Sequence, residues 1–333
     1  MATASRPKFT TFSDWHQFVI EQRQLPPEEA ANLYELRKNC YSRIEELRGR
    51  PLIVYAVQFP NDHPRVPISI DQVDVDGFTD LIAATESESV DVLLHSPGGS
   101  PEATERIVAL LRTAFNTVNF LIPHSAFSAA TMLAFSGNEI VLHPSACLGP
   151  IDPQINGTPA RSIKRGFERI RDLLKQEGPE ALPAYIPLIE KYSIELLEVC
   201  DDAENLSKEL AKQWLTEFMF SDDDAASKNE VIERAVDYFS SYDLHKTHSR
   251  PITFNKLQPL SLKITVAESD LRDLLREAHI LISGLFSLTS FVKVYENSHG
   301  LTWGRQFEVQ VGKIQIPQPQ SQPQISLPNA DFN

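Results

Sequence analysis

Two turns that follow predicted strands carry the residues best suited to acyl-transfer chemistry. Ser128 lies between a predicted strand and the apolar run AATMLAF, and Gly98 and Gly99 follow the preceding strand in the run HSPGGS. A serine at a strand-to-helix turn exposes its hydroxyl beside the free N–H groups of the helix N-terminus. Two glycines let the backbone approach a substrate closely. We therefore predict that Ser128 is a nucleophile and that Gly98 or Gly99 donates an N–H group to an oxyanion.

Each of these features alone has an ordinary structural explanation. A serine before an apolar helix more often caps the helix than attacks a substrate, and Pro-Gly-Gly is usually only a turn. Their occurrence at the ends of two consecutive strands favours an active site.

Strands and helices alternate around the two turns. Buried strands are predicted by the apolar runs at residues 51–57, 90–95, 118–123 and 139–143. Helices are predicted within residues 70–86, where Asp74 or Asp76 is the expected N-cap, and at 101–115 and 129–136. This alternation predicts an α/β fold in which right-handed crossovers surround a largely parallel sheet.

Helical segments flank this core on both sides. We expect them at residues 13–22, 28–47, 160–176, 182–200, 205–218, 223–239 and 268–282, with strand character at 291–295. The Pro- and Gln-rich tail is expected to be disordered. The predicted organisation is an N-terminal helical lead (1–50), a catalytic core (51–155), a helical extension with C-terminal elements of the same domain (156–310) and the tail (311–333).

Composition narrows the class of protein. The 333 residues carry a formal net charge of −14 and no basic stripe, which argues against nucleic-acid binding. The three cysteines lie far apart and match no metal-ligand spacing, so we expect free thiols in a reducing compartment, and no metal or cofactor. No apolar run has the roughly 20 residues of a membrane span, and no signal peptide is evident. We therefore expect a cytoplasmic location. If the protein acts on membrane proteins, it must reach them from outside the bilayer.

The chain resembles the serine dehydrogenase proteinase family, within the group that contains the Clp protease proteolytic subunit and signal peptide peptidase A. The resemblance is carried by HSPGGSPEATERIVALLR and by VNFLIPHSAFSAATMLAFSGNEIVLHPSACLGPIDPQ, and it covers about residues 35–285. It implies a Clp/crotonase-like fold of repeated β-β-α or β-α turns with helical additions. It also implies a Ser128 nucleophile, an oxyanion hole from Gly98 or Gly99 with Ala129, a polypeptide substrate and a homo-oligomer.

The general base is not identified by the motif. Clp-type relatives have a histidine near the position of Ile151 or Asp152, and signal peptide peptidase A uses a lysine. We rank Lys191 first because its neighbours are apolar, with Lys164 and His124 as alternatives.

Three polar residues near the predicted site are assigned structural roles. We expect His245 and His248 to be structural, and Asp152 to be a turn residue at the rim of the site.

Two functions compete. The first is a serine peptidase of the Ser-Lys type. The second is a catalytically impaired scaffold, because Ala129-Ala130 replaces the Gly-Gly that follows the nucleophile in relatives. An acyl-CoA enzyme is a weaker third option, since no CoA-binding signature is visible.

Overall fold

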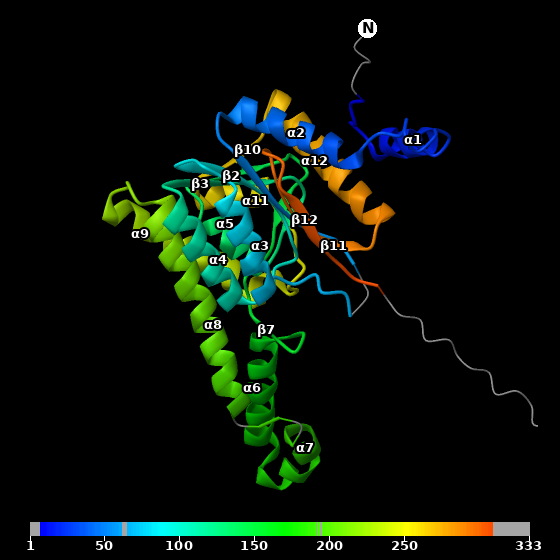
Figure 1. Ribbon diagram of the computed structural model, residues 1–333. Coiled ribbons are helices and arrows are strands. Elements are labelled where there is room, and N and C mark those ends of the chain that lie inside the picture. The colour runs from blue at the N-terminus through cyan, green and yellow to red at the C-terminus, as the bar shows by residue number, and fades with distance from the viewer. Residues whose placement is uncertain (1–6, 62–64, 191, 194, 309–333) are drawn as a thin grey trace, which may run out of the picture.

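A seven-stranded, mostly parallel sheet forms the centre of the protein (Figure 1). The computed structural model describes residues 7–61, 65–190, 192–193 and 195–308. In spatial order the strands are β10 (Ile264–Val266), β5 (Glu139–Leu142), β3 (Thr117–Ile122), β2 (Ser89–His95), β1 (Leu52–Val57), β11 (Phe291–Asn297) and β12 (Thr302–Gln306). Neighbours from β10 to β1 run parallel, whereas β11 and β12 add an antiparallel hairpin at one edge. The fold is therefore α/β, as predicted.

Both faces of the sheet are covered by helices. On β1, Ile53, Tyr55 and Val57 point into the larger apolar core, and Leu52, Val54 and Ala56 point into the other. Helices α3 (Gln72–Ala83), α4 (Pro101–Ala114) and α5 (Ala129–Phe135) cover the first face. Helices α1 (Phe12–Gln22), α2 (Leu33–Arg48) and α12 (Ser269–Leu288) cover the second. Burial on both faces explains why β1 is an unbroken apolar run.

A second, three-stranded sheet joins the segments that surround the predicted site. Its strands are β4 (Ser125–Ala126), β6 (Cys147–Leu148) and β9 (Ile252–Thr253). An additional bridge pairs Ser96 with Ala126, with hydrogen bonds of 3.1 Å from the Ser96 N–H to the Ser125 carbonyl and from the Phe127 N–H to the Ser96 carbonyl. Residues near 97, 127, 149 and 251 are thus brought to one place.

A helical arm projects from the core (Figure 1). It consists of α6 (Ala160–Glu177), the short 3-10 helix η1 (Pro179–Ala181), α7 (Leu182–Ile189) and the outer part of α8 (Glu195–Trp214). The remaining elements are the π-helix η2 (Leu215–Met219), α9 (Ala225–Ser240), α10 (Tyr242–His245), α11 (Phe254–Leu257), the 3-10 helix η3 (Gln258–Leu260) and the β7–β8 hairpin (Gln154–Ile155 and Thr158–Pro159). In the described part of the chain no helix is long and apolar enough to cross a membrane.

Several predicted helix boundaries were wrong. Helix α3 is capped by Asp71, whose side chain accepts from the Val73 N–H, whereas Asp74 is the third helical residue and closes the capping box. Helix α2 begins five residues late, because Asn32 supplies its cap. The predicted break at residues 201–202 is absent, since α8 runs through it and Asp201 pairs with Lys164 of α6. Instead, the predicted helix at 182–200 is divided into α7 and α8. The predicted disordered tail lies outside the described residues.

Candidate active site

Ser128 occupies a strained turn between β4 and α5. Its backbone angles, φ 54° and ψ −125°, lie in a region that residues with a side chain rarely adopt. Its side chain makes no capping hydrogen bond to α5, although the residue stands at the N-cap position. Strain of this kind costs about 1–3 kcal/mol and concentrates at functional sites. The serine is therefore not a helix cap, and its hydroxyl is left for another role.

The Gly98-Gly99 turn packs directly against the backbone of this serine. Gly98 has φ +92°, and a Cβ on it would lie 2.4 Å from the Phe127 carbonyl oxygen and 2.8 Å from the Ala129 nitrogen. Its N–H group donates to the Ser96 hydroxyl at 3.1 Å. In the described part of the chain, the N–H groups of Gly99 and Ala129 donate to no acceptor. Of the two glycines that were predicted as donors, Gly99 is therefore the one with a free N–H group.

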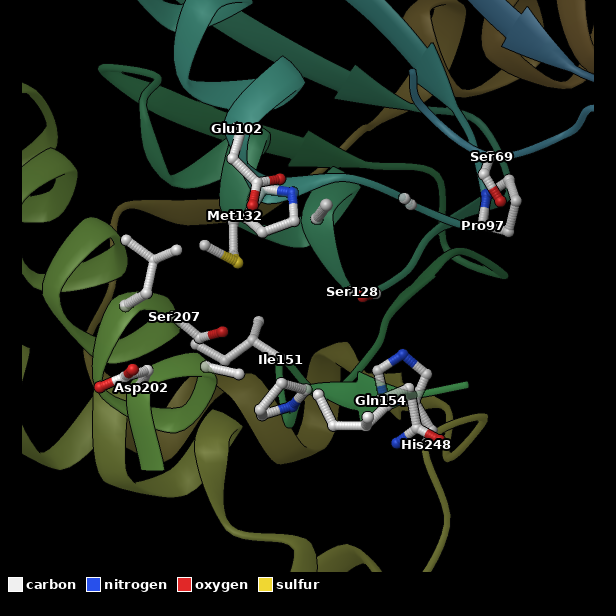
Figure 2. A pocket seen from close by; sticks show the side chains of 18 of the residues that line it. Ser69, Pro97, Glu102, Ser128, Met132, Ile151, Gln154, Asp202, Ser207 and His248 are labelled. Carbon is white, nitrogen blue, oxygen red and sulfur yellow. The ribbon is translucent and has the colours of Figure 1, made fainter. Parts of the chain in front are cut away.

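These residues line a cavity of about 700 Å³ (Figure 2). One wall is formed by Ile68, Ser69 and the glycine turn, and the opposite wall by one face of α8 that includes Leu206 and Ser207. Met132, one turn into α5, and Ile151 supply apolar surface. Because the cavity combines apolar walls with a few polar groups, it has the character of a ligand-binding site.

His248 faces the same cavity as Ser128 (Figure 2). Its Nδ1 lies 2.9 Å from Oδ1 of Asp152, a residue that is only 2% exposed. The other carboxylate oxygen of Asp152 accepts a hydrogen bond from the Gln154 side chain at 3.0 Å. A carboxylate accepts hydrogen bonds, so in this contact Nδ1 of His248 is the donor and Nε2 takes no part in it. His248, for which we expected a structural role, thus lines the same cavity as Ser128 and contacts the buried Asp152.

Ser128 and His248 are not hydrogen-bonded to each other in the described structure. A nucleophile and its base are often loosely arranged without substrate and tighten when the substrate binds. Ser128 and His248 line one cavity, and the buried Asp152 contacts His248 from outside that lining, so the three residue types of a Ser-His-Asp triad occur in this region.

Two of the three bases predicted from the sequence, Lys164 and His124, do not line the cavity. Lys164 is paired with Asp201 and, at 2.8 Å, with Glu204, and these hydrogen bonds raise its pKa, so it holds its proton. His124 is hydrogen-bonded to the Ser125 hydroxyl and stacked on His279, with ring centroids 4.6 Å apart, and it does not line the cavity. Lys191 lies outside the described residues, so its role remains a prediction.

His245 has the structural role that was expected. It is buried, and its Nε2 hydrogen-bonds the Tyr238 carbonyl at 2.7 Å. In the described residues no group of three or more His, Cys, Asp or Glu side chains is arranged to hold a metal ion.

Residues 68–274, more than half of the chain, match the family of ClpP-like SDH-type serine proteinases. The chain belongs to this family. The match includes the Gly98-Gly99 turn, Ser128, Asp152 and His248, and it ends before the β11–β12 hairpin. The parallel sheet and its covering helices are consistent with a ClpP-like fold.

Two curated relatives come from the archaeon Methanocaldococcus jannaschii. Uncharacterized protein MJ1495 is 30% identical over 179 residues, which cover 54% of this chain and 53% of the relative. Uncharacterized protein MJ0137 is 33% identical over 87 residues, which cover 26% of this chain and 30% of the relative. The matched region thus spans about half of the first relative and under a third of the second.

The sequence analysis did not bring His248 to the predicted site. The resemblance to Clp-type proteases implied a histidine near residues 151–152, where this chain has Ile151 and Asp152. A carboxylate at that position was a signal to search for a histidine elsewhere, and His248 lies 96 residues further along the chain. The pairing of β6 with β9 and the hydrogen bond of 2.9 Å from the Ile151 N–H to the Phe239 carbonyl help to bring the two segments together.

Proposed function

We propose that the protein is a serine peptidase in which Ser128 is the nucleophile, His248 the general base and Asp152 the residue that orients the base. The observation that carries the proposal is the shared cavity. A strained serine without a capping role and a histidine fixed by a buried carboxylate line the same cavity.

The proposed reaction uses Nε2 of His248 and the N–H groups of Gly99 and Ala129. Nε2 of His248 takes the proton from the Ser128 hydroxyl as Oγ attacks the carbonyl carbon of the scissile peptide bond. The carbonyl oxygen becomes an oxyanion, which the N–H groups of Gly99 and Ala129 stabilise. When the C–N bond breaks, the imidazolium returns the proton to the leaving amine. Water then hydrolyses the acyl-enzyme by the same steps.

The replacement of Gly-Gly by Ala129-Ala130 is compatible with this proposal. The Ala130 side chain belongs to the apolar core and does not line the cavity. Ala129 does line it, yet what the reaction needs from Ala129 is its backbone N–H group. Of the two alanines, only Ala129 therefore bears on the impaired-scaffold hypothesis, which also rests on the absence of a histidine at residues 151–152 and on the Pro- and Gln-rich tail.

Proteolysis of an unfolded polypeptide tests the proposed function. We expect the purified protein to cleave fluorescein-labelled casein, and Ser128→Ala to abolish the cleavage. His248→Ala is expected to remove nearly all activity, whereas Lys191→Met keeps it. Loss of activity in Lys191→Met with retention in His248→Ala would instead support the Ser-Lys type. Cleavage that persists in Ser128→Ala would contradict the nucleophile.

We also propose that the protein is a cytoplasmic homo-oligomer. The free thiols of Cys40, Cys147 and Cys200 suit a reducing compartment. The arm exposes Leu182, Ile186 and Leu188 to between 39% and 50%, beside an apolar groove of about 300 Å³ between α6 and α7. Exposed apolar surface of this kind supports association between copies.

A further inference from the structure

The segment at residues 68–71 forms the cavity wall beside the glycine turn. Ile68 and Ser69 line the cavity, and Ile70 is hydrogen-bonded to the turn on both sides. The Ile70 N–H donates to the Gly98 carbonyl at 2.7 Å, and the Ser100 N–H donates to the Ile70 carbonyl at 2.9 Å. A Cβ on Gly99 would lie 2.3 Å from the nitrogen and from the oxygen of Ile70. The position of the Gly99 N–H group is therefore set by this segment.

A buried lysine on β11 holds the segment in place. Lys293 is fully buried, and its Nζ donates to the Ser69 carbonyl at 2.6 Å and to both carboxylate oxygens of Asp74 at 2.8 and 2.9 Å. The Asp74 carboxylate also accepts the Asp71 N–H at 2.7 Å and the Tyr295 hydroxyl. One ammonium group thus connects β11 to the cavity wall and to the start of α3.

A second positively charged side chain of the β11–β12 hairpin binds the carboxylate of Asp71. Arg305 on β12 donates to both oxygens of Asp71 at 2.8 and 3.0 Å. Lys293 also lies 3.4 Å from Asp71. The negative charges of Asp71 and Asp74 are therefore both compensated by positively charged side chains of the β11–β12 hairpin. The family match does not cover this hairpin.

We propose that Lys293, assisted by Arg305, is a positioning residue for the reaction at Ser128. It fixes residues 69–71 and, through Ile70, the Gly99 N–H group that stabilises the oxyanion. The inference rests on the proposed function. It assigns to the C-terminal hairpin a part in the active site that the matched region alone does not supply.

The matched control lies on the opposite face of the same strand. Arg37 donates to Glu296 at 2.7 to 3.2 Å in a buried ion pair between α2 and β11, and neither residue lines the cavity. Arg37→Met and Lys293→Met each remove one partner of a buried ion pair. Only Lys293→Met releases the cavity wall. Arg305→Met provides a milder release, because Arg305 and Asp71 are 25% and 37% exposed.

Two measurements on the full chain test the proposal. Hydrolysis of 4-nitrophenyl acetate gives kcat and KM, and hydrogen–deuterium exchange reports the amides at residues 68–74 and 97–101. In Lys293→Met we expect kcat to fall about tenfold with KM nearly constant, less than the 10²–10³ for loss of an oxyanion donor. In Arg305→Met we expect a smaller fall of kcat, and in both variants we expect these amides to exchange faster. Arg37→Met is expected to lower the free energy of unfolding without changing kcat or the exchange rate of these amides.

The possible outcomes separate the two proposals. Unchanged exchange at these amides, or faster exchange with an unchanged kcat, would overturn the role of Lys293. An equal kcat loss in Arg37→Met would overturn it as well. If Lys293→Met does not fold, Arg305→Met decides by the same criteria. A wild-type protein without esterase activity would instead contradict the proposed function, and the exchange data would still decide whether Lys293 fixes the turn.

Discussion

Ser128 is held in a strained backbone conformation that lowers the stability of the folded protein. Its φ of 54° is unfavourable for any residue that carries a Cβ. We expect Ser128→Gly to be more stable than Ser128→Ala by about 1 kcal/mol, because glycine relieves the backbone strain and neither variant has a hydroxyl. Urea unfolding of both variants measures the difference. Equal free energies of unfolding would show that the turn is not strained.

In the proposed mechanism Asp152 orients the base, so the charge of its side chain matters more than its shape. Asp152→Asn keeps the size of the side chain, but an amide that donates to Nδ1 favours the wrong tautomer of His248. By comparison with the known triads, we expect kcat for casein cleavage to fall by about 10³–10⁴. Gln154→Leu, which removes only the second hydrogen bond to Asp152, is the milder control. Full activity in Asp152→Asn would remove Asp152 from the mechanism.

Gly98 is required for two reasons: its φ is positive, and a side chain at this position would collide with the neighbouring backbone. Gly98→Ala places a Cβ 2.4 Å from the Phe127 carbonyl oxygen, whereas at Gly157, with a similar φ of +79°, a Cβ would have nothing within 4 Å. We expect Gly98→Ala to lose about 1–3 kcal/mol more of the free energy of unfolding than Gly157→Ala, the usual cost of overpacking. Denaturant unfolding of both variants tests this. Equal losses would mean that the turn and the serine are not in rigid contact.

At the scale of elements, histidines join the ends of β2 and β3 to α12. His95 lies between the carbonyls of Phe59 and Ser125, and His279 is stacked on His124. Burial lowers the pKa of His95 to about 4 and that of His279 to about 2, with the nearby charge of Arg276 adding to the effect at His279. Both rings are therefore neutral in the folded protein near pH 7.

This cluster predicts a loss of stability in acid. Histidines of the unfolded chain titrate near 6.5, so below that pH the unfolded state binds more protons than the folded state. The free energy of unfolding should fall as the pH decreases from about 6.5 toward 4, by about 1.4 kcal/mol per pH unit for each such histidine. Urea unfolding at pH 7.5 and 5.0 measures the slope. His279→Phe should reduce it, and a slope unchanged by this substitution would contradict the account.

The elements of the core were predictable because local sequence determines them. The apolar runs of β1, β2, β3 and β5 and the periodicity of α4 predicted both their order and their positions to within a residue or two. The break predicted at residues 201–202 was wrong, and there Asp201 pairs with Lys164 of α6, a partner distant in the chain. The cap of α3 was also predicted at the wrong residue, although its signal is local, since Asp71 accepts from the Val73 N–H and Asp74 closes the capping box. The sequence singled out Ser128 and Gly99, which lie in local turns, but it could not bring His248 to the same cavity, because His248 is distant in the chain.

At the scale of the whole molecule, the arm carries a group of exposed apolar residues, Leu182, Ile186 and Leu188. If it joins copies of the chain, Ile186→Asp should lower the mass of the oligomer without unfolding the protein, because Ile186 is 39% exposed. Light scattering measures the mass, and circular dichroism confirms the fold. Val73→Asp, at a residue 45% exposed on α3, is the control away from the arm. A monomeric wild-type protein would contradict the proposed assembly.

The whole molecule also explains why the site needs distant segments. The proposed nucleophile follows β4, the proposed oxyanion turn follows β2, the proposed base precedes β9, and the proposed support of the cavity wall comes from β11 and β12. The sheets bring these segments to one place, which no single motif encodes.

The most direct test of the central claim is the rate at which a fluorophosphonate labels Ser128. Mass spectrometry of the intact protein and of its peptides gives the rate and the position of the label. The account predicts one label per chain on Ser128, none in Ser128→Ala, and labelling at least ~100-fold slower in His248→Ala, the order of general-base catalysis. A wild-type protein that is not labelled, or a His248→Ala variant that is labelled at the wild-type rate, would contradict it.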